Sequence, residues 1–393
     1  MTFKILTLNN IAVAGLRRLP RERYEVASEI AHPDAILVRS ADMHSMELPE
    51  GLLAVGRAGV GVNNIPVDAL SRRGIPVFNA PGANANAVKE LVIAGLLMAA
   101  RNLPEAWSYV RGLDGDGDAL ERAVEAGKKQ FVGFELPQRT LGVVGLGAIG
   151  VEVANAALKL GMQVMGYDPS ITVQSAWQLS SAVQKAHNLD ELFGRADVVS
   201  VHVPLTPDTE GLVGRSRLQL MPRGAVVLNF ARAEIVDETA VIGALDAGKL
   251  RAYVTDFPTR RLIDHPKVIC LPHLGASTRE AEENCAIMVV DNVREFLEHG
   301  NVTRSVNFPD AVLPRSRPHR VAIPHRNVPN MVAQILTALA AENINIANLL
   351  NHSRGDISYT IVDLDAPASA DTLKRIRAID GILSTRVMPI VES

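Results

Sequence analysis

Three glycines in the segment GLGAIG, residues 145–150, have the spacing that most clearly predicts a chemical role in this chain. An apolar segment at 141–144 precedes them, a helix-like segment at 151–160 follows, and Asp168 ends the next apolar segment. Glycines in such a turn let a phosphate approach the backbone, and the helix N-terminus supplies N–H donors and a positive dipole end. The pattern therefore predicts a dinucleotide site in which Asp168 accepts hydrogen bonds from the adenosine ribose.

The residues around Asp168 indicate which dinucleotide to expect. Its carboxylate would repel a 2′-phosphate, and the neighbouring Pro169 and Ser170 supply no arginine that could bind one. We therefore expect NAD rather than NADP as the cofactor.

Several longer segments resemble the D-2-hydroxyacid dehydrogenases. These are 141–150, 201–212, 229–241 and 271–278, while 56–67 and 79–92 are similar to the 3-phosphoglycerate dehydrogenases in particular. The resemblance covers nearly the whole chain, with little signal in about 101–135 and 170–185. It implies a set of cofactor contacts at Gly145, Gly147, Ala148, Ile149, Gly150, Asp168, His202, Pro204, Thr209, Phe230, Ala231, Arg232, Asp256, His273 and Gly275.

Two side chains in these segments have the chemistry to oxidise a 2-hydroxy acid. The planar guanidinium of Arg232 could bind a substrate carboxylate through two hydrogen bonds and polarise the carbonyl. His273 could take the hydroxyl proton while hydride leaves the carbon, because histidine exchanges protons near neutral pH. The resemblance implies these same two catalytic roles.

The usual partner of the catalytic histidine is missing from the sequence. Relatives pair it with a glutamate a few residues after the position of Asp256, but Arg260 and Arg261 stand where the acid is expected. A carboxylate there would raise the histidine pKa and fix its tautomer. We hypothesise that His273 works with a substitute partner or with none, and Asp264 is the nearest candidate in the sequence.

A phosphorylated acid also needs cations and N–H donors away from the reacting carbon. Arg39 and Ser40 end one apolar segment, and Arg57 ends another just before the turn Gly59, Val60 and Gly61. We expect the turn to offer N–H groups to a carboxylate and the two arginines to bind the phosphate. The alternative is that both arginines are ordinary exposed charges at strand ends.

The tail, residues 319–393, follows the order βαββαβ, which predicts a small ferredoxin-like unit. It resembles the ACT domain, a regulatory module of these dehydrogenases. The resemblance implies an L-serine site between paired domains, contacted by His325, Asn327 and Asn345. Asn330 stands where glycine is typical, and asparagine tolerates left-handed geometry. The alternative is a tail that only dimerises.

The order of apolar segments predicts the fold that positions these residues. Segments at 4–8, 35–40, 52–59 and 75–80 alternate with helix-like stretches, and six more follow between 140 and 272. This is typical of an α/β protein with two doubly wound parallel-sheet domains, Rossmann- or flavodoxin-like, before the ACT unit. We expect a substrate-binding domain at 1–97 and 280–305, an NAD-binding domain at 98–279, a linker at 306–318 and the ACT domain at 319–393.

Composition argues against several other classes of protein. The formal net charge of -3 gives no basic footprint for nucleic acid. No segment approaches the roughly 18 apolar residues of a membrane helix, and the N-terminus lacks the features of a signal peptide. Cys270 and Cys285 form no metal or redox spacing, so we expect no metal site and reduced thiols in a cytoplasmic protein.

The leading interpretation is an enzyme that oxidises 3-phospho-D-glycerate to 3-phosphooxypyruvate with NAD, the first step of L-serine biosynthesis. One alternative is another D-2-hydroxyacid dehydrogenase, such as a hydroxypyruvate or glyoxylate reductase, which would not need the arginine pair or the tail. A second is a non-enzymatic NAD-sensing protein, against which the presence of Arg232 and His273 argues. The family dimerises through its cofactor domain, so a homodimer or homotetramer is expected.

Overall fold

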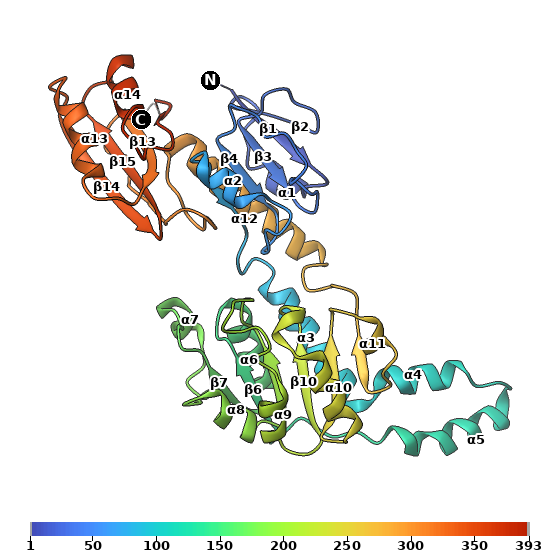
Figure 1. The fold of residues 1–393 in the computed structure, drawn as a ribbon. Helices are drawn as coiled ribbons and strands as arrows, with labels where there is room; N and C mark the ends of the chain where they lie inside the picture. The colour runs from blue at the N-terminus through green and yellow to red at the C-terminus, as the bar shows by residue number, and fades with distance from the viewer. Residues whose placement is uncertain (1, 391–393) are drawn as a thin grey trace. The chain divides into compact units, whose positions relative to one another are not determined.

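A computed structural model describes residues 2–390 of the chain, which forms two compact units (Figure 1). The first unit is Met1–Ala83 with Arg279–Ser393, and the second is Asn84–Thr278. Among the described residues, no helix is both long enough and apolar enough to cross a membrane.

The second unit contains a seven-stranded parallel sheet in the order β12-β11-β10-β9-β6-β7-β8. Its strand order reverses at β6, as in the dinucleotide-binding fold, and the inner strands are buried on both faces because helices cover both sides. The strands are β6 (Thr140–Val144), β7 (Gln163–Tyr167), β8 (Gln184–Lys185), β9 (Val198–Val201), β10 (Ala225–Asn229), β11 (Leu250–Thr255) and β12 (Val268–Cys270). The helices are α3 (Ala85–Arg101), α4 (Leu103–Arg111), α5 (Gly117–Gly127), α6 (Ala148–Lys159), α7 (Val173–Gln178), α8 (Leu189–Arg195), α9 (Arg215–Leu220), α10 (Glu238–Asp246) and α11 (Arg260–Ile263).

The boundary between the first and second units lies earlier in the chain than we expected from the sequence. We expected the break at 97/98, inside this helix, but all of α3 belongs to the second unit. Its apolar side chains pack with β6, β10 and β11 in one core, and Gly95 lets Phe230 approach so closely that a Cβ there would lie 2.9 Å from the ring. The break therefore comes at 83/84, just before the helix begins.

The first unit contains a five-stranded parallel sheet in the order β2-β1-β3-β4-β5, the flavodoxin-like arrangement. The sequence did not predict β2, a short edge strand that follows the charged stretch 21–23. Helix α12 crosses the sheet at β4, where a Cβ on Gly56 would lie 2.8 Å from Val293. The elements are β1 (Phe3–Leu8), α1 (Val13–Leu16), β2 (Tyr24–Ala27), β3 (Ala35–Val38), β4 (Ala54–Arg57), α2 (Val67–Arg72), β5 (Val77–Phe78) and α12 (Arg279–His299).

The tail forms the predicted βαββαβ unit, so the expected fold class is confirmed for all three parts. Its antiparallel sheet has the order β14-β15-β13-β16, and α13 and α14 pack on one face. The other face carries Tyr359 and Met388 into the core that holds Phe3 of β1 and Phe296 of α12. The elements are β13 (His319–Arg326), α13 (Met331–Ala340), β14 (Ile346–Arg354), β15 (Ile357–Leu364), α14 (Ala370–Arg377) and β16 (Arg386–Val387).

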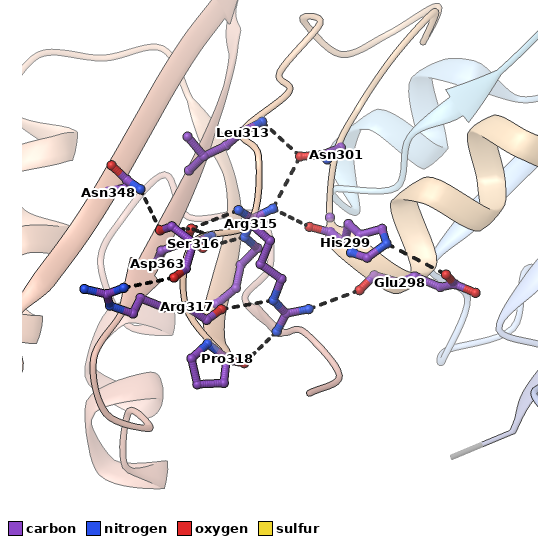
Figure 2. Close-up of polar contacts among 12 residues, drawn as sticks. Glu298, His299, Asn301, Leu313, Arg315, Ser316, Arg317, Pro318, Asn348 and Asp363 are labelled. Carbon is purple, nitrogen blue, oxygen red and sulfur yellow. Dashed lines mark hydrogen bonds and ion pairs between the residues drawn. The ribbon is translucent and has the colours of Figure 1, made fainter. Parts of the chain in front are cut away.

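A buried ion pair joins the tail to the end of α12 (Figure 2). Arg320 and Asp363 are both fully buried, with Nε donating to Oδ1 at 2.6 Å and Nη2 to Oδ2 at 3.0 Å. Arg320 Nη1 also donates to the His299 carbonyl at 3.0 Å, and the Ser316 N–H donates to Asp363 at 3.0 Å. In the segment that we expected to be a linker, Arg315 Nη1 donates to the Glu298 carbonyl of α12 at 3.4 Å, so with Ser316 this segment is bonded to both elements that it connects.

Candidate active site

Each of the three glycines in the loop between β6 and α6 is required for a different structural reason. Gly145 has a φ of +91°, and a Cβ on it would lie 2.6 Å from the His202 carbonyl. A Cβ on Gly150 would lie 1.9 Å from the Gly145 carbonyl oxygen. Gly147 precedes Ala148, which begins α6, and nothing lies within 4 Å of where its Cβ would be. Open space at Gly147 is what the approach of a pyrophosphate to the backbone requires.

Asp168 lies directly after β7 and holds the glycine loop in place. Its Oδ2 accepts a hydrogen bond from the Leu146 N–H at 2.8 Å, and its Oδ1 accepts one from the Ser170 N–H at 2.8 Å. Each carboxylate oxygen can accept more than one hydrogen bond, so both can still accept from a ribose hydroxyl. The residue predicted to bind the ribose thus also fixes the turn beside it.

The segment after β9 brings His202, Pro204 and Thr209 to the same edge of the sheet. The His202 N–H donates to the Val144 carbonyl at 2.7 Å, which places the residue against the end of β6. Burial lowers the pKa of its ring to about 4, so it is neutral near pH 7. The Thr209 hydroxyl donates to the Pro204 carbonyl at 2.6 Å and closes the turn.

Arg232 is held by a residue that the sequence analysis did not single out. Asn229, fully buried at the end of β10, donates to the Arg232 carbonyl at 2.8 Å and accepts from the Ala231 N–H at 3.1 Å. The half-buried Arg232 side chain donates to the Ala231 carbonyl at 2.6 Å. A polar residue at the end of an otherwise apolar strand was the signal that could have identified Asn229.

Asp256 and His273 lie next to each other at the ends of β11 and β12. Asp256 is only 1% exposed; its Oδ2 accepts from the Leu274 N–H at 3.1 Å, and its Oδ1 has no hydrogen-bond partner. Burial raises the pKa of this carboxyl, and the nearby charge of His273 opposes the rise. The exposed His273 ring contacts Phe257 edge-on, at 5.0 Å between centroids. Buried carboxylate oxygens normally accept a hydrogen bond, and the carboxamide N–H of a nicotinamide could donate one to Oδ1.

The arginines at the expected glutamate position are engaged with surface acids. Arg260 Nε donates to Asp264 at 2.9 Å, and Arg261 pairs with Glu238 at 3.2 Å. Asp264 therefore faces Arg260, and across residues 2–390 no carboxylate forms an ion pair or hydrogen bond with the His273 ring. Asp264 is thus paired with Arg260 and not with His273.

The first unit brings the predicted phosphate-binding residues together at the ends of β3 and β4. Arg57 Nε donates to the Arg39 carbonyl at 3.1 Å, and a Cβ on Gly59 would lie 2.6 Å from Arg57 Nη1. Arg39 Nη2 pairs with Glu282 of α12 at 2.7 Å, a contact between distant parts of the chain that the sequence did not reveal. Ser40, Val60 and Gly61 lie in the turns that follow these strands.

The three predicted serine contacts are not brought together within one chain. His325 is buried, with Nδ1 2.8 Å from the Arg326 carbonyl and Nε2 2.9 Å from the Thr360 hydroxyl, and Asn327 follows it. His325 pairs with Ser358, whereas Ile346, next to Asn345, pairs with Leu364 at the other end of β15. At about 3.3 Å per residue the two ends are roughly 20 Å apart. A site using all three residues therefore needs a second tail. Asn330 has the left-handed φ of 68° that we expected, so that turn survives.

Comparison with known proteins places this geometry among the dehydrogenases. The family model described as the NAD-binding domain of D-isomer specific 2-hydroxyacid dehydrogenases matches residues 93–275. A D-3-phosphoglycerate dehydrogenase of Escherichia coli is 32% identical over 353 residues, which is 86% of this chain and 82% of that protein. One from Methanocaldococcus jannaschii is 37% identical over 324 residues, 79% of this chain and 59% of that protein.

Solved structures give the same result. An NAD+-bound 3-phosphoglycerate dehydrogenase of Entamoeba histolytica matches with a TM-score of 0.62 and 27% identity, covering 78% of this chain and 99% of that one.

The chain spans less than two thirds of the length of two of the relatives that it matches. It covers 59% of the Methanocaldococcus jannaschii protein and 54% of one from Archaeoglobus fulgidus.

Proposed function

The chain belongs to the D-isomer-specific 2-hydroxyacid dehydrogenase family, and on this premise we propose that it oxidises 3-phospho-D-glycerate to 3-phosphooxypyruvate with NAD. This reaction would be the first step of L-serine biosynthesis in the cytoplasm. The observation that carries the proposal is the unpaired Oδ1 of Asp256 beside His273, on the sheet edge that also holds Arg232 and the glycine loop. Ligands of open α/β sheets bind at this carboxyl edge.

The residues of the second unit divide the reaction between them. Arg232 holds the substrate carboxylate and polarises the C2–O bond, and His273 takes the hydroxyl proton on its ring. NAD, when bound, accepts the hydride from C2. Asp256 Oδ1 would accept a hydrogen bond from the carboxamide N–H of bound NAD and so orient the nicotinamide.

An absorbance assay of NADH formation tests the proposal directly. The full chain with NAD and 3-phospho-D-glycerate should produce NADH, and D-glycerate without the phosphate should react much more slowly. Faster turnover of glyoxylate or hydroxypyruvate than of 3-phospho-D-glycerate or 3-phosphooxypyruvate would instead identify a different 2-hydroxyacid dehydrogenase. NAD binding without turnover of any of these substrates would favour a sensor.

Two glycine substitutions should separate folding from cofactor binding. Gly147→Ala should leave the melting temperature nearly unchanged, because its φ of -75° suits alanine and its Cβ meets no atom. NAD should then bind roughly ten- to a hundredfold more weakly, because the methyl group occupies the space for the pyrophosphate. Gly150→Ala should lower the melting temperature itself, because its Cβ would overlap the Gly145 carbonyl. Calorimetric NAD titrations and thermal unfolding measure both effects; equal NAD affinity for Gly147→Ala and the parent would contradict the assignment.

Arg57→Ala should affect the KM for a phosphorylated substrate more than the KM for an unphosphorylated one. Losing a charge-assisted contact to phosphate should raise KM for 3-phospho-D-glycerate roughly ten- to a hundredfold, with little change for D-glycerate. Arg21→Ala, at an exposed arginine of the same unit, is the matched control. Equal effects of Arg57→Ala on both substrates would remove Arg57 from the phosphate site.

We also infer that L-serine regulates the enzyme through the paired tails. Millimolar L-serine should lower the initial rate, D-serine should not, and Asn345→Ala should abolish the inhibition. The exposed amide of Asn345 is bonded to Asp365 and can be removed without disturbing a core. If L-serine has no effect at millimolar concentration, the tail serves dimerisation instead.

A homodimer or homotetramer is the assembly we propose. It is supported by α4, which projects from the second unit together with α5 (Figure 1). This helix exposes the apolar side chains of Leu103, Trp107 and Val110. Sedimentation equilibrium of the full chain measures the assembly, and a monomer at micromolar concentration would contradict it.

A further inference from the structure

Three polar residues are buried together on one face of the sheet of the second unit, near the carboxyl ends of two neighbouring strands. Asn229 ends β10, and Tyr253 and Thr255 lie on β11, where Thr255 pairs with Asn229 across the two strands. Tyr253 and Thr255 point to the same face because they are two positions apart in the strand. Asn229 and Thr255 are 0% exposed and Tyr253 is 2% exposed, so these side chains can act on a substrate only through other residues.

Hydrogen bonds join these three side chains to the loops that follow the two strands. Asn229 Nδ2 donates to the Arg232 carbonyl at 2.8 Å and to the Tyr253 hydroxyl at 3.4 Å. The Thr255 hydroxyl accepts from the Phe257 N–H at 3.2 Å. Burial raises the pKa of Tyr253, and its hydrogen bonds with Thr255 and Asn229 oppose the rise. The Tyr253 hydroxyl therefore links the segment of Arg232 to the segment of Phe257.

The Tyr253 hydroxyl is the part of this network that core packing does not require. A phenylalanine ring would fill the same space in the apolar core and would lack only this group. An amide nitrogen has two N–H donors, and the hydroxyl accepts the second N–H of Asn229, whose first is used by the Arg232 carbonyl. Without the hydroxyl, a buried N–H of Asn229 would lose its partner, and the amide could turn away from the Arg232 carbonyl.

We propose that Tyr253 is a positioning residue for substrate binding, whose hydroxyl holds the loops of Arg232 and Phe257 at a fixed separation. Through Asn229 it fixes the backbone from which the Arg232 guanidinium reaches the substrate carboxylate. Through Thr255 it fixes the N–H of Phe257, whose ring contacts the proposed general base. A displacement of about 1 Å in such a loop can lower the rate by on the order of 10²-fold. The inference rests on the proposed function, in which Arg232 binds the carboxylate.

Tyr253→Phe tests the proposal, and Tyr109→Phe is its matched control, because it also removes one hydrogen-bonded hydroxyl from the second unit. Tyr253→Phe should lower kcat/KM for 3-phospho-D-glycerate roughly tenfold. The Kd for NAD should change less than about threefold, because the glycine loop and Asp168 lie outside the network. Tyr109→Phe should leave kcat/KM as in the parent. A parental kcat/KM in Tyr253→Phe would overturn the proposal.

A double-mutant cycle with Arg232→Gln distinguishes positioning from a general loss of stability. If the hydroxyl acts through Arg232, Tyr253→Phe should change kcat/KM less than about twofold once the guanidinium is gone. A loss that reflected only a weakened fold would be the same roughly tenfold in both backgrounds, and that result would refute the positioning role.

Amide hydrogen exchange tests the same link without substrate or cofactor. The Ala231 N–H donates to Asn229 Oδ1 at 3.1 Å, and it should exchange roughly tenfold faster in Tyr253→Phe, as should the Phe257 N–H, while the amides of β6 should not change. Unchanged exchange at both positions would contradict the link whatever the substrate of the enzyme. Absence of NADH formation by the parent would instead count against the proposed function alone. If Tyr253→Phe does not fold, Thr255→Val, which removes the hydroxyl bonded to Phe257 and keeps the side-chain shape, should give the same results.

Discussion

His273→Gln should lower kcat for 3-phospho-D-glycerate oxidation by roughly 10²- to 10⁴-fold, the usual contribution of a general base. Glutamine can keep a hydrogen bond to the substrate hydroxyl but cannot take its proton. The ring lies at the end of β12, exposed on one side and against Phe257 on the other, so its loss should not disturb the core. Steady-state rates of NADH formation measure the effect.

The control for this variant separates chemistry from binding. NAD affinity should fall much less than kcat, because Asp256 and the glycine loop are untouched. His187→Gln, at an exposed histidine of the same unit, should leave kcat unchanged. A kcat within a factor of three of the parent would show that another group takes the proton.

Asp363→Ala should lower the free energy of unfolding of the first unit by about 3–5 kcal/mol, because it leaves the Arg320 guanidinium buried without its counter-charge. The loss should extend beyond the tail, because Asp363 holds the Arg320 guanidinium that donates to the His299 carbonyl at the end of α12 (Figure 2). Urea unfolding followed by circular dichroism measures the change. Replacing both partners with apolar residues, Arg320→Met with Asp363→Leu, should cost much less.

The same ion pair predicts a pH dependence. Burial alone would raise the pKa of Asp363, but the hydrogen bonds and charge of Arg320 and the Ser316 N–H outweigh it and hold the pKa below its ordinary value. A carboxyl with a lowered folded pKa stabilises the fold above the unfolded pKa of about 3.9 and loses that contribution as the pH falls further. The stability difference between parent and Asp363→Asn should therefore narrow below about pH 4. A difference that is constant from pH 7 to pH 3 would contradict this account.

Edge strands and long-range contacts account for most of what the sequence did not predict. The strands β2 and β8 are short edges with exposed residues, so they lack the apolar runs that identify inner strands. Asp264 was proposed for its closeness in sequence, but an arginine one helical turn away binds it. Arg39 precedes the second unit in the sequence and Glu282 follows it, so no local sequence pattern encodes the contact between them.

The sequence by itself determined the βα order and the glycine loop with Asp168, and it predicted Arg232 and His273 as the catalytic pair, because each of these depends on residues a few positions apart. Short-range spacing sets strand, turn and helix, and parallel strands bring their carboxyl ends to one edge. The tertiary structure alone decided that Asp256 is buried with a free oxygen beside His273, and that the buried Arg320–Asp363 pair holds the tail to the end of α12. Burial and hydrogen-bond partners depend on which distant segments pack together, and that is a property of the folded chain.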